Sequence, residues 1–198
     1  MKKEIDNIEI ILPFINPQSE DEFYFLQLLK RKKENPELGS NSVVIRNYYI
    51  KSKEHLLKVY SEVKEICRVT NSRAMIQLNK RSFENVFYQF NENVAHCLKN
   101  KDFINMSNQY DRAIGQTNAD KENKWIVDID EPFNETEHAF LTFCINNLQP
   151  VGREKELAII PSKSGYHLIS RPFNKEEFNK IYTKIDIQKN NPTNLFIP

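Results

Sequence analysis

The sequence predicts an α+β protein built of two lobes. Its 198 residues are enough for one sizeable domain or two small lobes. Some segments carry apolar residues at helical spacing, and others are short runs rich in β-branched and aromatic residues. Residues 115–120 form the clearest linker, and the order of the predicted elements changes after it. We therefore expect an N-terminal helical α/β lobe over residues 1–115 and a second lobe over residues 116–198.

The N-terminal lobe is expected to open with a helix. Residues 19–22 have the pattern of a capping box, Phe23, Leu26 and Leu29 follow it, and Pro36 ends the segment. The basic residues 31–33 would then lie at the solvated end of this helix. The later elements are a strand over residues 42–50, a helix capped by Ser52, a strand over residues 73–79, a helix capped by Ser82 and a helix over residues 101–113.

The second lobe has a different order of elements. They are a strand over residues 125–130, a helix over residues 135–148 capped by Asn134, strands over residues 156–161 and 165–170, a helix from Asn174 to Tyr182 and a strand over residues 185–188. This β-α-β-β-α-β order is that of an RRM-like, or ferredoxin-like, unit. In that unit the first strand lies between the third and the fourth. Residues 195–197 are expected to form a short edge strand.

Bulk properties limit the classes of protein to consider. With 28 Lys and Arg against 27 Asp and Glu, a strongly basic nucleic-acid coat is excluded, although a local basic groove is not. Cys67, Cys97 and Cys144 are far apart and lack CxxC spacing, which favours buried reduced thiols. No apolar run reaches the roughly 20 residues that span a bilayer, and residues 1–6 lack the apolar core of a signal peptide. We expect a cytoplasmic protein with no membrane partner.

The first strand of the second lobe ends in two carboxylates. Asp128 and Asp130 share one face of it because side chains alternate, and the apolar residues of the other face can pack on helices. Such a pair is often only a solvated strand end, but its like charges repel unless a cation or base neutralises them. Asp186, on the last core strand, would lie nearby. Three oxygen donors on one face predict a Mg²⁺ or Mn²⁺ site formed by Asp128, Asp130 and Asp186.

A Ser-Lys-Ser-Gly turn and a histidine are expected opposite these carboxylates. Gly165 permits close backbone approach, Ser162 and Ser164 offer hydroxyls, Lys163 offers a charge and His167 a directed donor. A turn of this kind by itself is usually a plain hairpin turn, and no Walker A pattern is present. Beside three carboxylates, however, the group predicts binding of a triphosphate.

These residues resemble the three motifs of the archaeo-eukaryotic primase superfamily, also called primase-polymerases. Residues 127–130 resemble its acidic pair, residues 162–167 its small-x-His element and residues 185–186 its hydrophobic-Asp element, in the same order. The resemblance implies a small phage- or bacterial-type member with an RRM-like catalytic core. Gly165 holds the small position of the second motif and brings no side-chain hydroxyl.

The resemblance also implies roles for residues. Asp128, Asp130 and Asp186 would bind two divalent metals, and Lys163, Ser164 and His167 would contact the phosphates of the nucleotide. In the N-terminal lobe, Arg73, Asn79, Lys80 and Arg81 would contact template or nucleotide. The implied activity is that of a DNA primase or primase-polymerase, a template-directed nucleotidyltransferase that forms phosphodiester bonds by a two-metal mechanism. Its expected partners are nucleoside triphosphates, a single-stranded template and a replicative helicase or other replication protein.

Two other functions are compatible with an RRM-like core. One is a non-catalytic module that binds nucleotide or single-stranded nucleic acid as a replication accessory or phage regulator. The other is a rolling-circle replication initiator, whose chemistry needs a His-x-His metal motif. No His-x-His occurs in the sequence, which disfavours the initiator.

Overall fold

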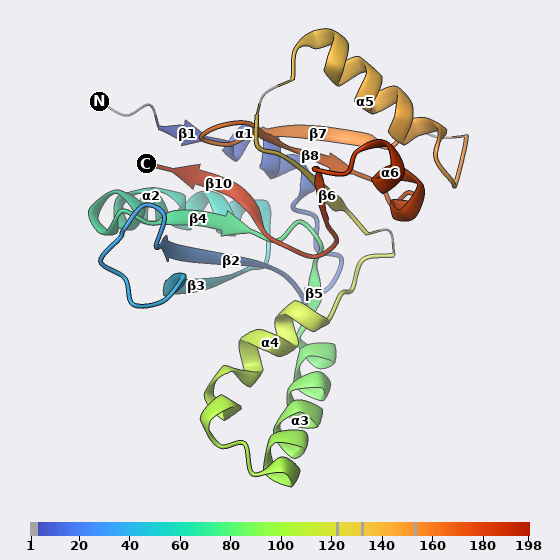
Figure 1. Cartoon of the computed structure of the whole chain (residues 1–198). Coiled ribbons are helices and arrows are strands. Elements are labelled where there is room, and N and C mark those ends of the chain that lie inside the picture. Colours follow the sequence, from blue (N-terminus) through green and yellow to red (C-terminus); the bar gives the residue numbers. More distant parts are fainter. Residues whose placement is uncertain (1–3, 122, 132, 153) are drawn as a thin grey trace.

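The computed structural model describes residues 4–121, 123–131, 133–152 and 154–198. Over these residues the protein is mixed α+β, and its strands form two antiparallel sheets (Figure 1). Residues 1–3 lie outside the described residues. They are part of the N-terminal segment that is predicted to lack a signal peptide. None of the described helices is long and apolar enough to cross a membrane.

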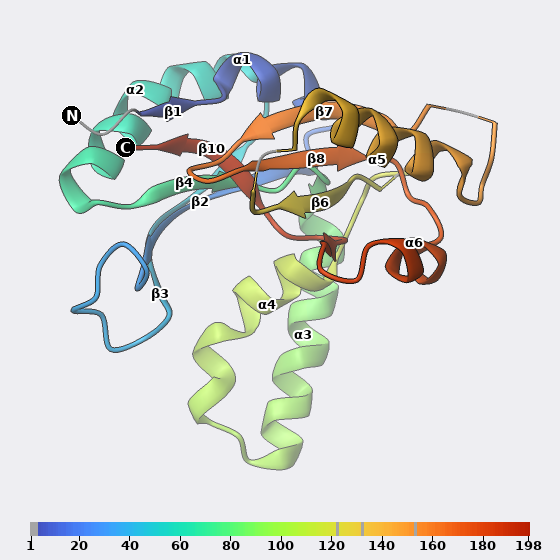
Figure 2. The same ribbon diagram turned by 45° about the horizontal axis from the view of Figure 1, so that its top comes forward.

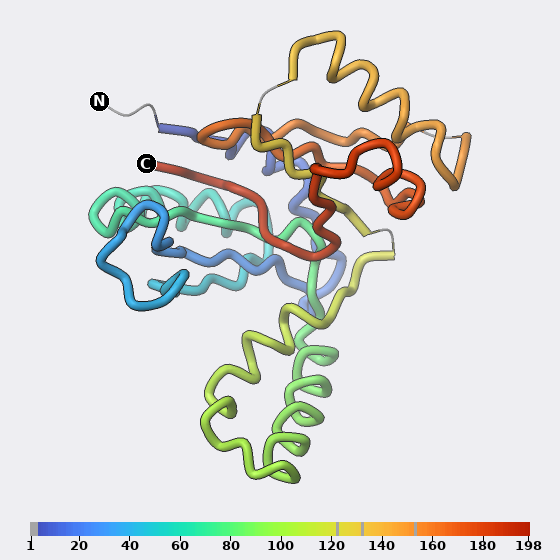
Figure 3. Tube along the Cα trace, in the orientation of Figure 1, coloured from blue at the N-terminus to red at the C-terminus, as the bar shows by residue number. Residues whose placement is uncertain are grey.

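The first sheet is built from both ends of the chain. Its strands, in spatial order, are β1 (Ile5–Asp6), β10 (Thr193–Ile197), β4 (Arg73–Ile76), β2 (Glu22–Arg31) and β3 (Ser42–Ile50), and the short β5 (Arg81–Ser82) pairs with β2. Because β1 pairs with β10, Ile5 near the start of the chain lies beside Ile197 near its end, and the two strands run next to each other in Figure 3.

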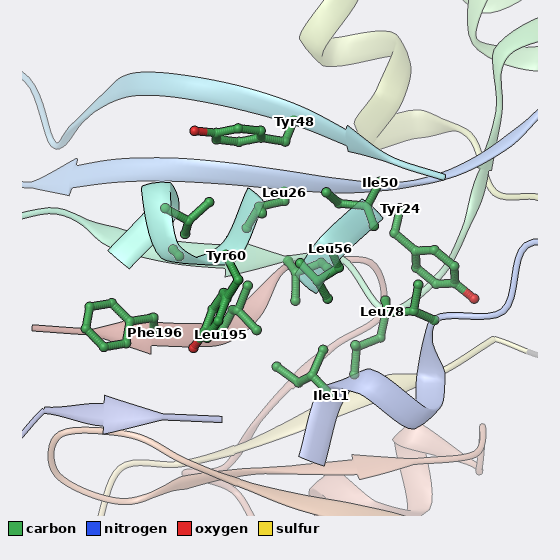
Figure 4. Close-up of a cluster of buried hydrophobic side chains, with 14 of the residues drawn as sticks. Ile11, Tyr24, Leu26, Tyr48, Ile50, Leu56, Tyr60, Leu78, Leu195 and Phe196 are labelled. Carbon is green, nitrogen blue, oxygen red and sulfur yellow. The ribbon is translucent and has the colours of Figure 1, made fainter. Parts of the chain in front are cut away.

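A helical layer packs on one face of this sheet. It consists of α2 (Lys53–Thr70), the short α1 (Ile8–Ile11) and the 3₁₀ turn Leu12–Phe14. Ser52 caps α2 as predicted, its side chain accepting a hydrogen bond from the His55 N–H. The core between helix and sheet is made of fully buried side chains that come together in Figure 4: Ile11, Leu26, Ile50, Leu56 and Leu195.

The helix predicted from residue 19 onward is wrong, because the segment forms strand β2. Phe23 and Phe25 pack in one cluster, whereas Tyr24 and Leu26 pack in the main core on the other face. A strand buried on both faces is a continuous apolar run, which lacks the alternation typical of a half-exposed strand. Glu22 does not close a capping box, since its carboxylate accepts from the Gln18 N–H and from Lys80 Nζ.

The C-terminal strand is also placed differently from the prediction. β10 is not an edge strand, because it lies between β1 and β4 and all five of its residues are buried. The chain therefore leaves the second sheet after residue 188 and returns to the first, where it ends. This return brings Thr193 and Asn194 next to residues of the second sheet.

The second sheet has the strand order β7-β8-β6-β9. Its strands are β6 (Trp125–Ile129), β7 (Glu156–Pro161), β8 (Tyr166–Ser170) and β9 (Asp186–Gln188). The first strand of this set, β6, pairs antiparallel with the third and the fourth, as the sequence predicts. The connecting helices are α5 (Glu135–Asn147), which begins with a capping box of Asn134 and Glu137, and α6 (Lys175–Ile181), which Asn174 caps.

The two faces of the second sheet have different neighbours. Val127, Leu168 and Ile187 pack under α5 and α6, which lie together over that face in Figures 1 and 2. On the opposite face, Ile126 and Ile169 join the core of the first lobe. Asp128 and Asp130 continue this second face beyond its apolar part, so the carboxylates face the first lobe and not an open sheet surface.

Two helices project from the body as an arm. They are α3 (Phe83–Asn100) and α4 (Gln109–Gln116), joined through the 3₁₀ turn Ile104–Asn108 (Figures 1 and 2). Ser82 caps α3 as predicted. The fourth helix begins later than predicted, because Lys101 adopts a left-handed conformation that ends α3.

Candidate functional site

A cavity of about 680 Å³ lies where the two sheets meet. From the second sheet it is lined by Asp128, Asp130, Ser162, Lys163, Ser164, His167 and Gln188. From the first sheet and its loops it is lined by Leu29, Arg31, Lys33, Glu34, Pro36, Ser42, Arg73, Met75 and Asn194, and Asn191 and Pro192 complete it. The predicted carboxylate pair, the predicted phosphate turn and a set of basic residues therefore share one cavity.

Strand register places the acidic residues and the histidine together. Asp128 on β6 is the direct partner of His167 on β8 and of Asp186 on β9. Direct partners in an antiparallel pair project from the same face with Cβ atoms about 4.5–5.5 Å apart. Asp130 lies on that face two residues along the chain. The sequence prediction that Asp128 lies between His167 and Asp186 is confirmed.

The Asp128 carboxylate is half-buried and has two side-chain neighbours. Gln188 Nε2 donates to Asp128 Oδ2 at 3.2 Å, and His167 Nε2 lies 3.5 Å from Asp128 Oδ1. Burial raises the pKa of Asp128, and the charges of Asp130 and Asp186 raise it further, while His167 opposes the shift. Burial is thus the main cause of the raised pKa of Asp128, and the two neighbouring carboxylates add to it; a cation beside them would favour the ionised form.

His167 is held in place by the other sheet. Its Nδ1 lies 2.8 Å from the hydroxyl of Thr193, which is fully buried on β10. Burial lowers the pKa of His167, although the charge of Asp128 opposes this. A neutral imidazole has one N–H, so a hydroxyl proton donated by Thr193 to Nδ1 would leave Nε2–H directed at Asp128. The contact with Thr193 thereby holds the ring with Nε2 on the side of Asp128, and a hydroxyl can serve either tautomer as a partner.

The acidic residues can be compared with the needs of a divalent metal. Carboxylate oxygens are the donors that Mg²⁺ and Mn²⁺ prefer, and Asp128, Asp130 and Asp186 bring them to one face of the sheet. Among the described residues, no three His, Cys, Asp or Glu side chains are already gathered around one point where an ion could sit. The residues therefore fit a metal site in type and in strand position, and the side chains would have to turn toward one another to form it.

The turn between β7 and β8 is packed against the end of β6. The Ser162 N–H donates to the Gly165 carbonyl at 2.9 Å, and the Gly165 N–H donates to Ser162 Oγ at 3.1 Å. A Cβ atom at Gly165 would lie 1.9 Å from the Ile129 carbonyl oxygen and 2.8 Å from the Asp130 carbonyl carbon. A hydroxyl-bearing residue cannot occupy this position without moving the turn. Ser164 remains the hydroxyl on the exposed part of the turn, beside Lys163.

The basic cluster predicted to contact nucleic acid is engaged inside the protein. Arg81 is fully buried, and its guanidinium donates to the carbonyl oxygens of Ile114 and Asn79 and to Asn190 Oδ1. Burial lowers the pKa of Arg81 to about 10. Its role is structural, in place of the predicted template contact, because none of its surface is open to a ligand.

Asn79 and Lys80 likewise bind other parts of the chain. Asn79 is buried and joins the two lobes, since its Nδ2 donates to the Lys124 carbonyl at 2.9 Å and its Oδ1 accepts from the Lys124 N–H at 2.7 Å. Lys80 Nζ forms an ion pair with Glu22 at 2.8 Å. Of the four residues predicted in this lobe, Arg73 is the one that lines the cavity.

Several residues of the site were not predicted from the sequence. Arg31 and Lys33 line the cavity, although the sequence places them at a solvated helix end. Arg31 reaches it as the last residue of β2, and Lys33 lies in the turn that follows this strand. Thr193 and Asn194 depend on the return of β10 to the first sheet, which no local pattern signals.

Comparisons with known protein families, with curated proteins and with solved structures found no match. A function is therefore inferred from the residues of this chain and their geometry. The strongest features are the register of β6 with its two neighbours and the cavity that this register borders.

Proposed function

We propose that the protein is a template-directed nucleotidyltransferase of the primase-polymerase type, with an RRM-like catalytic lobe. The observation that carries the proposal is the pairing of Asp128 with both His167 and Asp186. Asp128 and His167 line the cavity, whereas Asp186 lies beside Asp128 on the next strand and outside the cavity lining. The strand order β7-β8-β6-β9, with α5 and α6 on one face, is the order expected of a ferredoxin-like unit and supports the proposed fold.

The charges around the cavity support a nucleoside triphosphate as its ligand. Asp128 and Asp130 lie on one side, whereas Lys163 on the turn and Arg31 on β2 bring positive charge. Arg31 acts electrostatically on both Asp128 and His167. A triphosphate with divalent cations carries both signs of charge and would be complementary to such a cavity.

Each residue has a separate task in this proposal. Asp128, Asp130 and Asp186 would hold Mg²⁺ or Mn²⁺, which supplies charge neutralisation for the attacking and leaving oxygens. Lys163 and Ser164 would bind phosphate oxygens, and His167 would donate a hydrogen bond from Nε2. Thr193 keeps the imidazole in the orientation that allows this. Holding the reacting groups in place accounts for most of the catalysis expected in such a site.

The partners follow from the activity. A single-stranded nucleic acid would serve as template, and a replicative helicase or another replication protein would accompany a cytoplasmic enzyme of this kind. Because Asn79, Lys80 and Arg81 are engaged within the protein, the template is proposed to use other side chains.

Incorporation of labelled nucleotide on single-stranded DNA tests the proposal. The reaction is run with and without a primer, in Mg²⁺ and in Mn²⁺. We expect metal-dependent products from the wild type, none from Asp128→Asn, and wild-type yield from Glu9→Gln, which alters an exposed carboxylate that does not line the cavity. Nucleotide binding without any incorporation would favour the non-catalytic binding module instead.

A further inference from the structure

The side chain of Asn7 joins the N-terminal segment to both sheets. Asn7 lies between β1 and α1, which run beside β10 and β7 in Figures 1 and 2, and it is 2% exposed. Its Nδ2 donates to the Asn194 carbonyl at 2.9 Å and to the Pro161 carbonyl at 3.1 Å. The first carbonyl belongs to β10 of the first sheet and the second to the last residue of β7 in the second sheet. One side-chain amide therefore holds a strand from each sheet.

The backbone of Asn7 is fixed as well. Its N–H donates to the Leu195 carbonyl at 3.0 Å, and its own carbonyl accepts from the N–H groups of Ile10 and Ile11 in α1. The side chain is short, so a fixed backbone leaves its amide little freedom. The position of the amide is thus set by β10 and α1, and not by the β7–β8 turn that it reaches.

The contact with Pro161 fixes the peptide unit that opens the turn over residues 162–165. A peptide unit is planar, so the Pro161 carbonyl and the Ser162 N–H point in opposite directions. The carbonyl accepts from Asn7, and the N–H donates to the Gly165 carbonyl at 2.9 Å. Because this unit is held at both ends, it cannot rotate without breaking a hydrogen bond. Asn7 thereby supports the turn that carries Lys163.

The contact with Asn194 relates the same turn to the histidine of the cavity. Asn194 directly follows Thr193, whose hydroxyl lies 2.8 Å from His167 Nδ1. Asn7 therefore ties the strand that orients His167 to the turn that carries Lys163. Both of these side chains line the cavity, whereas Asn7 lies outside the cavity lining.

We propose that Asn7 is a positioning residue that sets the turn over residues 162–165 in place, relative to His167, before the nucleotide binds. The proposal rests on the proposed function, in which Lys163 and His167 bind the phosphates. A turn that is already ordered costs less free energy to bind than one that the ligand must order. Without Asn7 the binding-competent turn would be only fractionally populated, and the apparent affinity falls by that fraction.

A split between KM and kcat is expected from this role. Bound phosphates would order the loosened turn at the expense of affinity, after which the site is the same as in the wild type. Asn7→Ala should therefore raise the KM and the dissociation constant for a nucleoside triphosphate by about 10-fold and leave kcat within about twofold. Affinity for single-stranded DNA should not change.

Asn79→Ala provides the matched control. Asn79 is also a buried asparagine that joins the two lobes, through its hydrogen bonds with Lys124, and it lies outside the cavity lining. Both variants should unfold at a lower temperature than the wild type, because each loses buried hydrogen bonds. Only Asn7→Ala should weaken binding of the triphosphate. Equal losses of nucleotide affinity in the two variants would reduce Asn7 to a general stabilising residue and overturn the proposal.

Hydrogen exchange of two amides tests the proposal without any nucleotide. The N–H groups of Ser162 and Gly165 are bonded within the turn. They should exchange about 10- to 100-fold faster in Asn7→Ala than in Asn79→Ala, as expected when a buried hydrogen bond that holds the turn is lost. In the wild type, both amides should be protected about 100-fold or more relative to an unstructured peptide. Unprotected amides in the wild type would overturn the proposal even where a variant fails to fold.

The outcomes separate this proposal from the proposed function. Unchanged exchange at Ser162 in Asn7→Ala, or a fall in kcat with an unchanged KM, would overturn the positioning role and leave the nucleotidyltransferase standing. Faster exchange at the turn in Asn7→Ala, together with no binding of triphosphate by the wild type, would overturn the proposed function and confirm that Asn7 holds the turn.

Discussion

Replacement of Gly165 by alanine should damage both stability and nucleotide binding. The new Cβ would lie 1.9 Å from the Ile129 carbonyl oxygen, whereas real Cβ contacts essentially never fall below 3.0 Å. The turn must therefore move by about 1 Å or more, and its obstacle is backbone, which cannot swing aside as a side chain does. Overpacking of this kind typically costs about 1–3 kcal/mol, and we expect a value near the upper end.

The consequences of this change can be measured separately. A loss of about 3 kcal/mol corresponds to a melting temperature about 6–12 °C lower for a chain of this size. Displacement of the turn by about 1 Å should also slow nucleotide incorporation by roughly 100-fold and weaken nucleotide binding. Thermal unfolding, the rate of incorporation and nucleotide titration report these effects. Gly165→Ser tests whether the hydroxyl expected from the family resemblance can be accommodated.

Gly115→Ala provides the matched control. A Cβ at Gly115 would meet nothing within 4 Å, and the residue lies in helix α4. The change should be neutral or stabilise the protein by up to about 1 kcal/mol. If Gly165→Ala melted with the wild type and bound nucleotide normally, the packing of the turn against β6 would be wrong.

Two further predictions concern buried groups. Thr193→Val removes the hydroxyl that contacts His167, so it should lower the unfolding free energy by about 1–3 kcal/mol and weaken nucleotide binding. Thr193→Ser keeps the hydroxyl and should retain both properties. Equal behaviour of the two variants would show that the Thr193 hydroxyl has no part in the site. Burial raises the pKa of the Cys67 thiol from 9.0 to about 11, so the folded state keeps its proton where the unfolded state loses it. The stability from this group is complete below pH 9 and should fall by about 2–3 kcal/mol as the pH rises through 11. The unfolding free energy, measured by chemical denaturation across this pH range, should fall less steeply with pH for Cys67→Ala than for the wild type. An equal dependence on pH in the two proteins would contradict the raised pKa of Cys67.

Much of the site could be predicted because it depends on local pattern and on one recurring topology. Asp128 and Asp130 alternate along the chain with apolar residues, so the sequence predicts both the strand and the face on which the two carboxylates lie. The β-α-β-β-α-β order then predicts that β6 lies between β8 and β9, which the register confirms. Caps such as Ser52 and Asn134 were predicted correctly because each needs only a few neighbouring residues.

The remainder depends on long-range packing. β2 is buried on both faces, so its sequence does not alternate and its pattern resembles that of a helix. Arg81 was expected to contact template or nucleotide with its basic neighbours, but it is buried because carbonyl groups that include that of Ile114 in α4 accept from its guanidinium. Thr193 reaches His167 only because β10 crosses from one sheet to the other, and a single sequence contains no signal for that crossing.

The most direct test of the account asks whether Asp128 and Asp186 act as one site. Nucleotide incorporation is measured for Asp128→Asn, Asp186→Asn and the double variant in a double-mutant cycle. Residues that hold a shared metal should each abolish the activity, so the double variant should lose no more than either single variant. Losses that are partial and additive, or wild-type activity in Asp186→Asn, would contradict a shared site built by the β6–β9 register.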